Sequence, residues 1–123
     1  MKIISPNQEQ GSTRTAGPTF TGTVYLFMTM PTTDGVTINN VCFSPGARTF
    51  WHSHEHGQIL MVLAGKGLVQ AEGEPAREIY EGDTVWVPSG ERHWHGASKD
   101  NYMTHKAISM GNTHWGEEVA AND

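Results

Sequence analysis

Short runs of apolar, β-branched and aromatic residues, separated by glycine and proline, form the main pattern of the chain. Runs of this length and composition are typical of β-strands rather than helices. They predict strands at residues 22–28, 36–43, 48–54, 58–65, 68–73, 76–81, 83–88, 92–98 and 102–109, with turn sequences such as TTDG, SPGA and AGKG between them. Many short strands at regular spacing predict an all-β sandwich or barrel. The C-terminal HWGEEVAAND is the one stretch that could form a helical turn.

The alternation of side chains along a strand assigns residues to the inside or the outside of this barrel. The run 58–65 is predicted to turn Gln58, Leu60 and Val62 inward and Ile59, Met61 and Leu63 outward. An apolar outer face needs cover from another sheet or subunit, which favours a homodimer or larger homo-oligomer. In the run 102–109, the charged Lys106 suits solvent, so His105 and Ser109 are predicted to face inward.

Composition narrows the class of protein. A chain of 123 residues suits one domain, with an expected arm at 1–19, a core domain at 20–119 and a tail at 120–123. The net charge of -5 argues against nucleic acid as a partner, because nothing here neutralises phosphates. One cysteine excludes an internal disulfide, and no apolar run reaches membrane-spanning length. The N-terminus does not read as a signal peptide, so we expect a cytoplasmic protein with no membrane partner.

Two pairs of histidines suggest a metal site. His52 and His54 share one strand face, as do His93 and His95, and both pairs lie in predicted strands. Neutral imidazole is the commonest metal ligand in proteins. The alternative is that these are surface histidines, or core histidines that bond to backbone groups. That alternative requires several buried rings to find separate partners, so the pattern favours the metal. We expect His56 and His114 to be surface or loop residues.

The spacing around these pairs resembles the two sequence motifs of the cupin family. Those motifs are Gly-x5-His-x-His-x3-Glu-x6-Gly and Gly-x5-Pro-x-Gly-x2-His-x3-Asn. The segments GARTFWHSHEHGQILMVLAG and GDTVWVPSGERHWHGA match every fixed position except two. Gln58 stands where the family usually has glutamate, and Ala97 where it often has asparagine. The resemblance implies a jelly-roll-like antiparallel β-barrel of two packed sheets, commonly dimeric, with one divalent metal held by His52, His54, Gln58 and His93.

Within that family, PGARTFWHSH, GDTVW, HWHGA and MTH are similar to small single-domain cupins that act as bacterial hydroxynitrile lyases. The likeness runs from about residue 20 to residue 119. It implies manganese as the usual ion, with iron, nickel, cobalt or zinc as alternatives. It also implies His105 as catalytic acid or base and places His95 in the pocket, and both are expected as catalytic residues, with either able to protonate the departing cyanide. Thr49 is placed at the mouth by the same likeness, although strand parity from His52 does not put it there unless a bulge intervenes.

The function expected on these grounds is cleavage or formation of a small-molecule cyanohydrin. A substrate pocket is predicted at Asn39, Val41, Phe43, Thr49, Leu60 and Ser109. Because Gln58 is neutral, the metal would keep its full charge and act as a stronger Lewis acid. Two alternatives remain open: a metal-dependent dioxygenase, and a metal-bound binding module without turnover.

Overall fold

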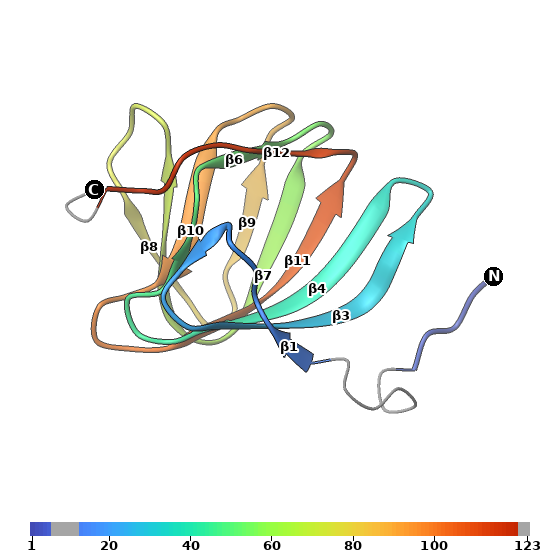
Figure 1. Ribbon diagram of the computed structural model, residues 1–123, viewed down its shortest axis with the longest axis horizontal. Helices are drawn as coiled ribbons and strands as arrows, with labels where there is room; N and C mark the ends of the chain where they lie inside the picture. The colour runs from blue at the N-terminus through green and yellow to red at the C-terminus, as the bar shows by residue number, and fades with distance from the viewer. Residues whose placement is uncertain (6–12, 121–123) are drawn as a thin grey trace.

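The computed structural model describes residues 1–5 and 13–120, and in this part of the chain every regular element is a strand (Figure 1). The predicted all-β class is therefore confirmed. The strands are β1 (Thr13–Thr15), β2 (Phe20–Thr21), β3 (Val24–Thr33), β4 (Val36–Phe43), β5 (Arg48–Thr49), β6 (His52–His54), β7 (Gln58–Ala71), β8 (Arg77–Tyr80), β9 (Thr84–Val87), β10 (His93–Ala97), β11 (Met103–Met110) and β12 (Thr113–Trp115).

The strands form two antiparallel sheets that curve into a barrel (Figure 1). One sheet runs in the order β1-β3-β4-β11-β7, with β9 on the far edge of β7. The other contains β2, β5, β10 and the second half of β7, with β8 and the β6–β12 pair at its edges. The barrel core is the buried cluster of Val24, Val41, Phe43, Ala47, Val62, Ile79, Ala97 and Met103.

A single strand, β7, connects the two sheets. The predicted break at AGKG is wrong, because Gln58–Ala71 is one strand of 14 residues. Its first half pairs with β9 and β11, and its second half pairs with β8 and β10. Gly65 has φ of 82°, and a Cβ there would lie 2.0 Å from the carbonyl oxygen of Tyr102. Glycine is therefore required, but at a bend between sheets rather than at a chain reversal.

The predicted strand 48–54 is interrupted. Arg48 pairs with Gly96 of β10 and His52 pairs with His93, so four steps along one chain match three along the other. Such an extra residue is a bulge, and it changes which face the following side chains occupy. It turns Thr49 inward together with His52, and both are almost fully buried. The bulge that Thr49 required is thus present.

The strand parities predicted for the core strands are confirmed. Leu60 and Val62 are buried, whereas Met61 and Leu63 are 40% and 43% exposed. On β11 the inward His105 is fully buried. The described part of the chain contains no helix long and apolar enough to cross a membrane.

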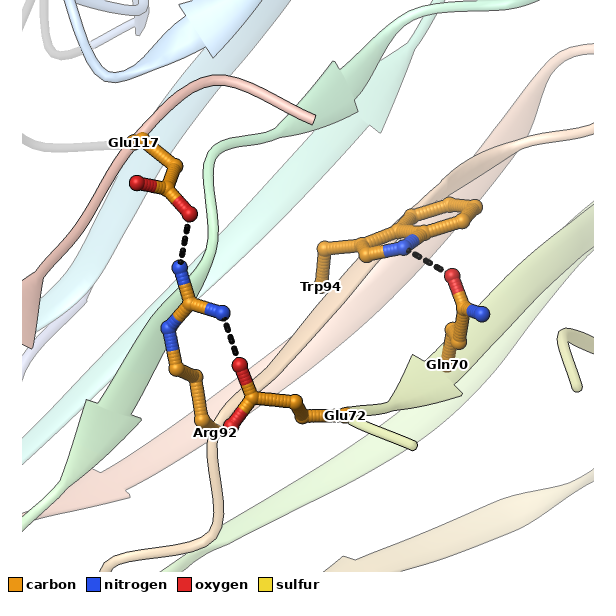
Figure 2. A network of polar contacts seen from close by, with 5 residues as sticks. All are labelled: Gln70, Glu72, Arg92, Trp94 and Glu117. Atoms are coloured by element: carbon orange, nitrogen blue, oxygen red, sulfur yellow. Dashed lines mark hydrogen bonds and ion pairs between the residues drawn. The ribbon is translucent and has the colours of Figure 1, made fainter. Parts of the chain in front are cut away.

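The C-terminal segment closes one side of the barrel. The sequence allowed a helical turn within residues 114–123. Residues 113–115 instead form β12, which pairs with β6, and no helix is present up to residue 120. Residues 121–123 lie outside the described part of the chain. Arg92 donates hydrogen bonds to the carboxylates of Glu72 and Glu117 (Figure 2). Its guanidinium also lies over the ring of Trp51. Trp94 donates to Gln70 Oε1 at 2.7 Å beside this network (Figure 2). Through Arg92, the segment after β12 that contains Glu117 is connected to the sheet that contains the histidines.

Candidate metal centre and cavity

A cavity of about 290 Å³ lies inside the barrel and is lined by residues of both sheets. Its walls come from β2 to β7, from β10 to β12 and from the segment before β2. Four of the seven histidines line it, His52, His54, His95 and His105, and His93 lies beside His52 and His95; each of the five is at most 4% exposed. His56 and His114 are exposed, as expected.

Three of these histidines form the tightest cluster. Ring nitrogens of His52, His93 and His95 all lie within 4.8 Å of one another, which suggests a metal site. His54 is not in this trio, but its ring centroid is 5.0 Å from that of His52. Two of the three, His52 and His93, belong to the ligand set expected from the sequence. The third, His95, was expected to be a catalytic pocket residue rather than a ligand.

Two of the expected ligands are oriented by the backbone. Nδ1 of His52 lies 2.8 Å from the carbonyl oxygen of Phe50, and Nδ1 of His93 lies 3.0 Å from that of Glu91. A carbonyl oxygen only accepts, so each Nδ1 carries the proton. Each Nε2 is left with a lone pair, which is the form that binds a metal.

The other two expected ligands are oriented by hydroxyl groups. Nδ1 of His54 is 3.1 Å from Thr113 Oγ1, and Gln58 Nε2 donates to Ser109 Oγ at 3.0 Å. These contacts leave Nε2 of His54 buried and without a hydrogen-bond partner among the described residues. They also turn Oε1 of Gln58 toward the other histidines.

The contact between Gln58 and His93 supports a bound cation. Gln58 Oε1 lies 3.1 Å from His93 Nε2. With the His93 proton on Nδ1, both atoms present lone pairs to each other, which is unfavourable without a positive charge between them. The buried, unpaired Nε2 of His54 points to the same requirement. Nitrogen and amide oxygen donors of this kind suit a first-row divalent metal, so the residues fit the ion that the sequence motifs imply.

Burial keeps these imidazoles neutral. It lowers the pKa of His54 to about 4 and that of His105 to about 4. Burial, together with the charge of neighbouring histidines, lowers the pKa of His52 and of His95 well below the usual 6.5, and burial lowers that of His93. At neutral pH the site therefore offers lone pairs rather than positive charges.

His95 and His105 form a second pair beside the cluster. Nε2 of His105 and Nδ1 of His95 are 2.9 Å apart, so one of them donates to the other. The outer nitrogens, His95 Nε2 and His105 Nδ1, are buried with no partner in the described structure. Phe43 packs against both rings, with centroids 6.0 Å and 5.2 Å away. When one outer nitrogen gains a proton and the other loses one, the shared proton shifts between the rings, and the two outer nitrogens exchange their donor and acceptor roles.

The predicted pocket residues divide into two groups. Asn39, Val41, Thr49 and Ser109 line the cavity. Phe43 and Leu60 are fully buried and support the wall without lining it.

Some cavity residues were missed by sequence reasoning. Thr113 and Trp115 come from β12, which was not predicted as a strand, and the Trp115 ring lies 4.6 Å from that of His52. Thr19 belongs to the expected arm, yet it lines the cavity and accepts a hydrogen bond from Phe50 N. The alternation of Thr113 and Trp115 about His114 was the available signal, but three residues are too few to identify a strand.

The chain belongs to the cupin family: the model of the cupin domain matches residues 39–105. A relative from Granulicella tundricola, (R)-mandelonitrile lyase, is 48% identical over 91 residues, which cover 72% of this chain and 70% of the relative. The motif resemblance read from the histidine and glycine spacing is thereby confirmed.

Solved structures agree with this assignment. A cupin-like protein from Thermotoga maritima is 42% identical, with a TM-score of 0.79 over 82% of this chain and 81% of that one. The polyketide cyclase RemF from Streptomyces resistomycificus shares the fold at 16% identity, with a TM-score of 0.74 over 98% of this chain and 86% of that one. An enzymatic role is plausible on the strength of the lyase relative, whereas RemF supports the fold alone.

Proposed function

We propose that the protein is a metal-dependent hydroxynitrile lyase, which interconverts a cyanohydrin with a carbonyl compound and hydrogen cyanide. The observation that carries the proposal is that His52, His54, Gln58 and the buried His95–His105 pair line one cavity, with His93 beside His52 and His95. The similarity to (R)-mandelonitrile lyase supports it. The proposed metal ligands are His52, His54, Gln58 and His93, and manganese is the proposed ion.

The ligand set determines what the ion would contribute. All four side chains are neutral, so a bound divalent ion would keep its charge and lower the pKa of a substrate hydroxyl, or polarise a carbonyl in the reverse direction. His54 remains in the proposed set because Thr113 leaves its Nε2 buried and unpaired. His95 is placed outside the set because the proton transfer proposed below uses its contact with His105.

The histidine pair supplies the proton transfers. In the cleavage direction, His105 is the proposed base that takes the hydroxyl proton. The carbon–carbon bond to the nitrile then breaks, and its electron pair leaves with cyanide. Cyanide receives a proton from the His95–His105 pair, which returns to its neutral state. A neutral imidazole suits the first step because it has a free lone pair near neutral pH.

The test is anaerobic incubation of the manganese-loaded protein with racemic mandelonitrile at mildly acidic pH, where background decay is slow. We expect benzaldehyde release with preference for one enantiomer, and none above background from metal-stripped protein. Gln58→Glu should retain the metal yet slow cleavage, since a carboxylate reduces Lewis acidity. Equal release with and without metal would refute the proposal. Oxygen consumption in a separate aerobic assay with an electron-rich aromatic substrate would instead favour a dioxygenase, and no activity in either assay would favour a binding module.

A homodimer is also proposed, on the outer face of the β4–β11–β7–β9 sheet. Ile38, Ile108, Ile59 and Trp86 lie in one cross-strand row there. Trp86 is 59% exposed, and Met61 and Leu63 are exposed beside the row. A continuous apolar strip across a sheet suits a two-fold contact. Light scattering of wild type and Trp86→Glu should give a dimer mass and a smaller mass, respectively; a monomeric wild type would contradict the dimer.

A further inference from the structure

The amide of Asn39 is an unsatisfied polar group in the cavity wall. Asn39 lies on β4, and its side chain lines the cavity. Its Oδ1 is buried and has no hydrogen-bond partner within the described residues. A buried acceptor without a partner is costly, so the structure leaves room for a donor from a bound molecule.

The neighbouring polar groups are already engaged. Ser109 and Thr37 face each other in register beside Asn39, and both line the cavity. Ser109 Oγ accepts from Gln58, and Thr37 Oγ1 lies 2.6 Å from Thr32 Oγ1. Among these three side chains, only Asn39 has a buried polar atom with no partner in the described structure.

A water molecule is a poor substitute for that donor. The residues paired with Asn39 across β3 and β11 are Met28 and Ala107, and neither side chain forms a strong hydrogen bond. Ordered buried waters generally need two to four polar partners. A ligand, by contrast, can bring its own donor to Asn39 Oδ1 without needing further polar partners there.

The distance from the histidine pair fixes where the donor must lie on the ligand. Val41 pairs with His105 and Asn39 pairs with Ala107, so Asn39 is two residues along the strand from the proposed base. Two residues of a strand span roughly 7 Å. A molecule that reacts at His105 therefore reaches Asn39 with a group about one aromatic ring away from the reacting carbon.

We propose that Asn39 selects substrates with a hydroxyl group remote from the reacting carbon, such as ring-hydroxylated aromatic cyanohydrins and their carbonyl products. This inference rests on the proposed function, because the reacting carbon is placed by it. Asn39 Oδ1 accepts the hydroxyl hydrogen bond, and Val41 and Ala107 contact the apolar part between the two ends. An analogue with a methoxy group fills the same space and lacks the donor.

The experiment measures binding without cyanide, so that no turnover is needed. The manganese-loaded protein is titrated calorimetrically with 3- and 4-hydroxyacetophenone and with the matching methoxyacetophenones. We expect at least one hydroxy compound to bind about tenfold more tightly than its methoxy partner, as a single hydrogen bond provides. Asn39→Leu and Asn39→Ala should abolish this ratio. Thr37→Val, which changes a polar wall residue that already has a partner, should preserve it.

The outcomes separate this inference from the proposed function. An unchanged ratio in both Asn39 variants, no ratio in the wild type, or no binding of any probe would each overturn the role of Asn39. A ratio that depends on Asn39, combined with failure to cleave mandelonitrile and its hydroxylated derivatives, would leave Asn39 as a recognition residue and reject the lyase. Thermal melts of each variant establish that folding is unchanged.

Discussion

Two parts of the cavity differ in how far their polar groups are satisfied. At the proposed metal ligands, the ring nitrogen or amide behind each ligand has a partner: Phe50, Glu91, Thr113 or Ser109. On the β4 wall, Asn39 pairs across the sheet with Met28 and Ala107 and has a free acceptor. The first arrangement orients ligands for one ion, and the second leaves a contact for a variable molecule. Under the two proposals above, metal binding and substrate choice are carried by separate residues of one pocket.

Removal of a proposed ligand should have the largest effect. His93→Ala deletes a ligand shared by the sequence motif and the tightest histidine cluster, so metal content measured by elemental analysis should fall from about one ion per chain to almost none. His54→Ala and His95→Ala then distinguish the proposed ligand set, which contains His54, from the closest histidine trio, which contains His95. We expect the metal to be lost in His54→Ala and kept in His95→Ala. The reverse result would replace His54 by His95 as a ligand.

Removal of the proposed base, His105, should have the second-largest effect. His105→Ala is expected to lower the lyase rate by about two to four orders of magnitude, because a positioned proton acceptor contributes that much. The metal content should stay at the wild-type level, since His105 is not a ligand. Steady-state kinetics beside elemental analysis checks both statements. A loss of metal in His105→Ala would show that the two histidine groups are not independent.

Below neutral pH, the dependence of stability on pH should arise mainly from the buried histidines. The pKa of His105 falls from 6.5 when unfolded to about 4 when folded. A depressed folded pKa means that the unfolded chain binds more protons below pH 6.5, so protonation favours unfolding. The metal-free protein should have constant stability above about pH 7 and lose on the order of 3 kcal/mol per such histidine between pH 6.5 and 4. Urea melts at several pH values measure this, and a flat profile would contradict it.

Loss of a supporting hydroxyl should give the smallest effect. Ser109→Ala and Thr113→Val each remove one contact behind a proposed ligand, and metal affinity should fall roughly 10- to 100-fold. Thr104→Val, on the outward side of β11, is the matched control and should leave affinity unchanged. Competition with a chelator measures the dissociation constants. Wild-type affinity in both variants would mean that the ligands are oriented by packing instead.

Strand composition and parity accounted for much of the barrel because they depend on local physics. The period of two placed Leu60 and His105 inside and Met61 outside. The same reasoning failed where two strands or two sheets interact. Gly65 reads as a turn in the sequence, but it bends β7 because the carbonyl of Tyr102 leaves no space for a Cβ. Whether a glycine reverses or bends a chain is decided by the strands packed against it.

The sequence by itself determined the family and the histidines that gather at one site, because the motif spacing and the strand period bring His52 and His93 together. Only the tertiary structure decided which of their neighbours share the cavity. Thr113 meets His54 from 59 residues away, and Ser109 meets Gln58 from 51 residues away. The unpaired acceptor of Asn39 also becomes visible only when the partners of Thr37 and Ser109 are known. Hydrogen-bond satisfaction is a property of the packed molecule, and no local pattern in the chain encodes it.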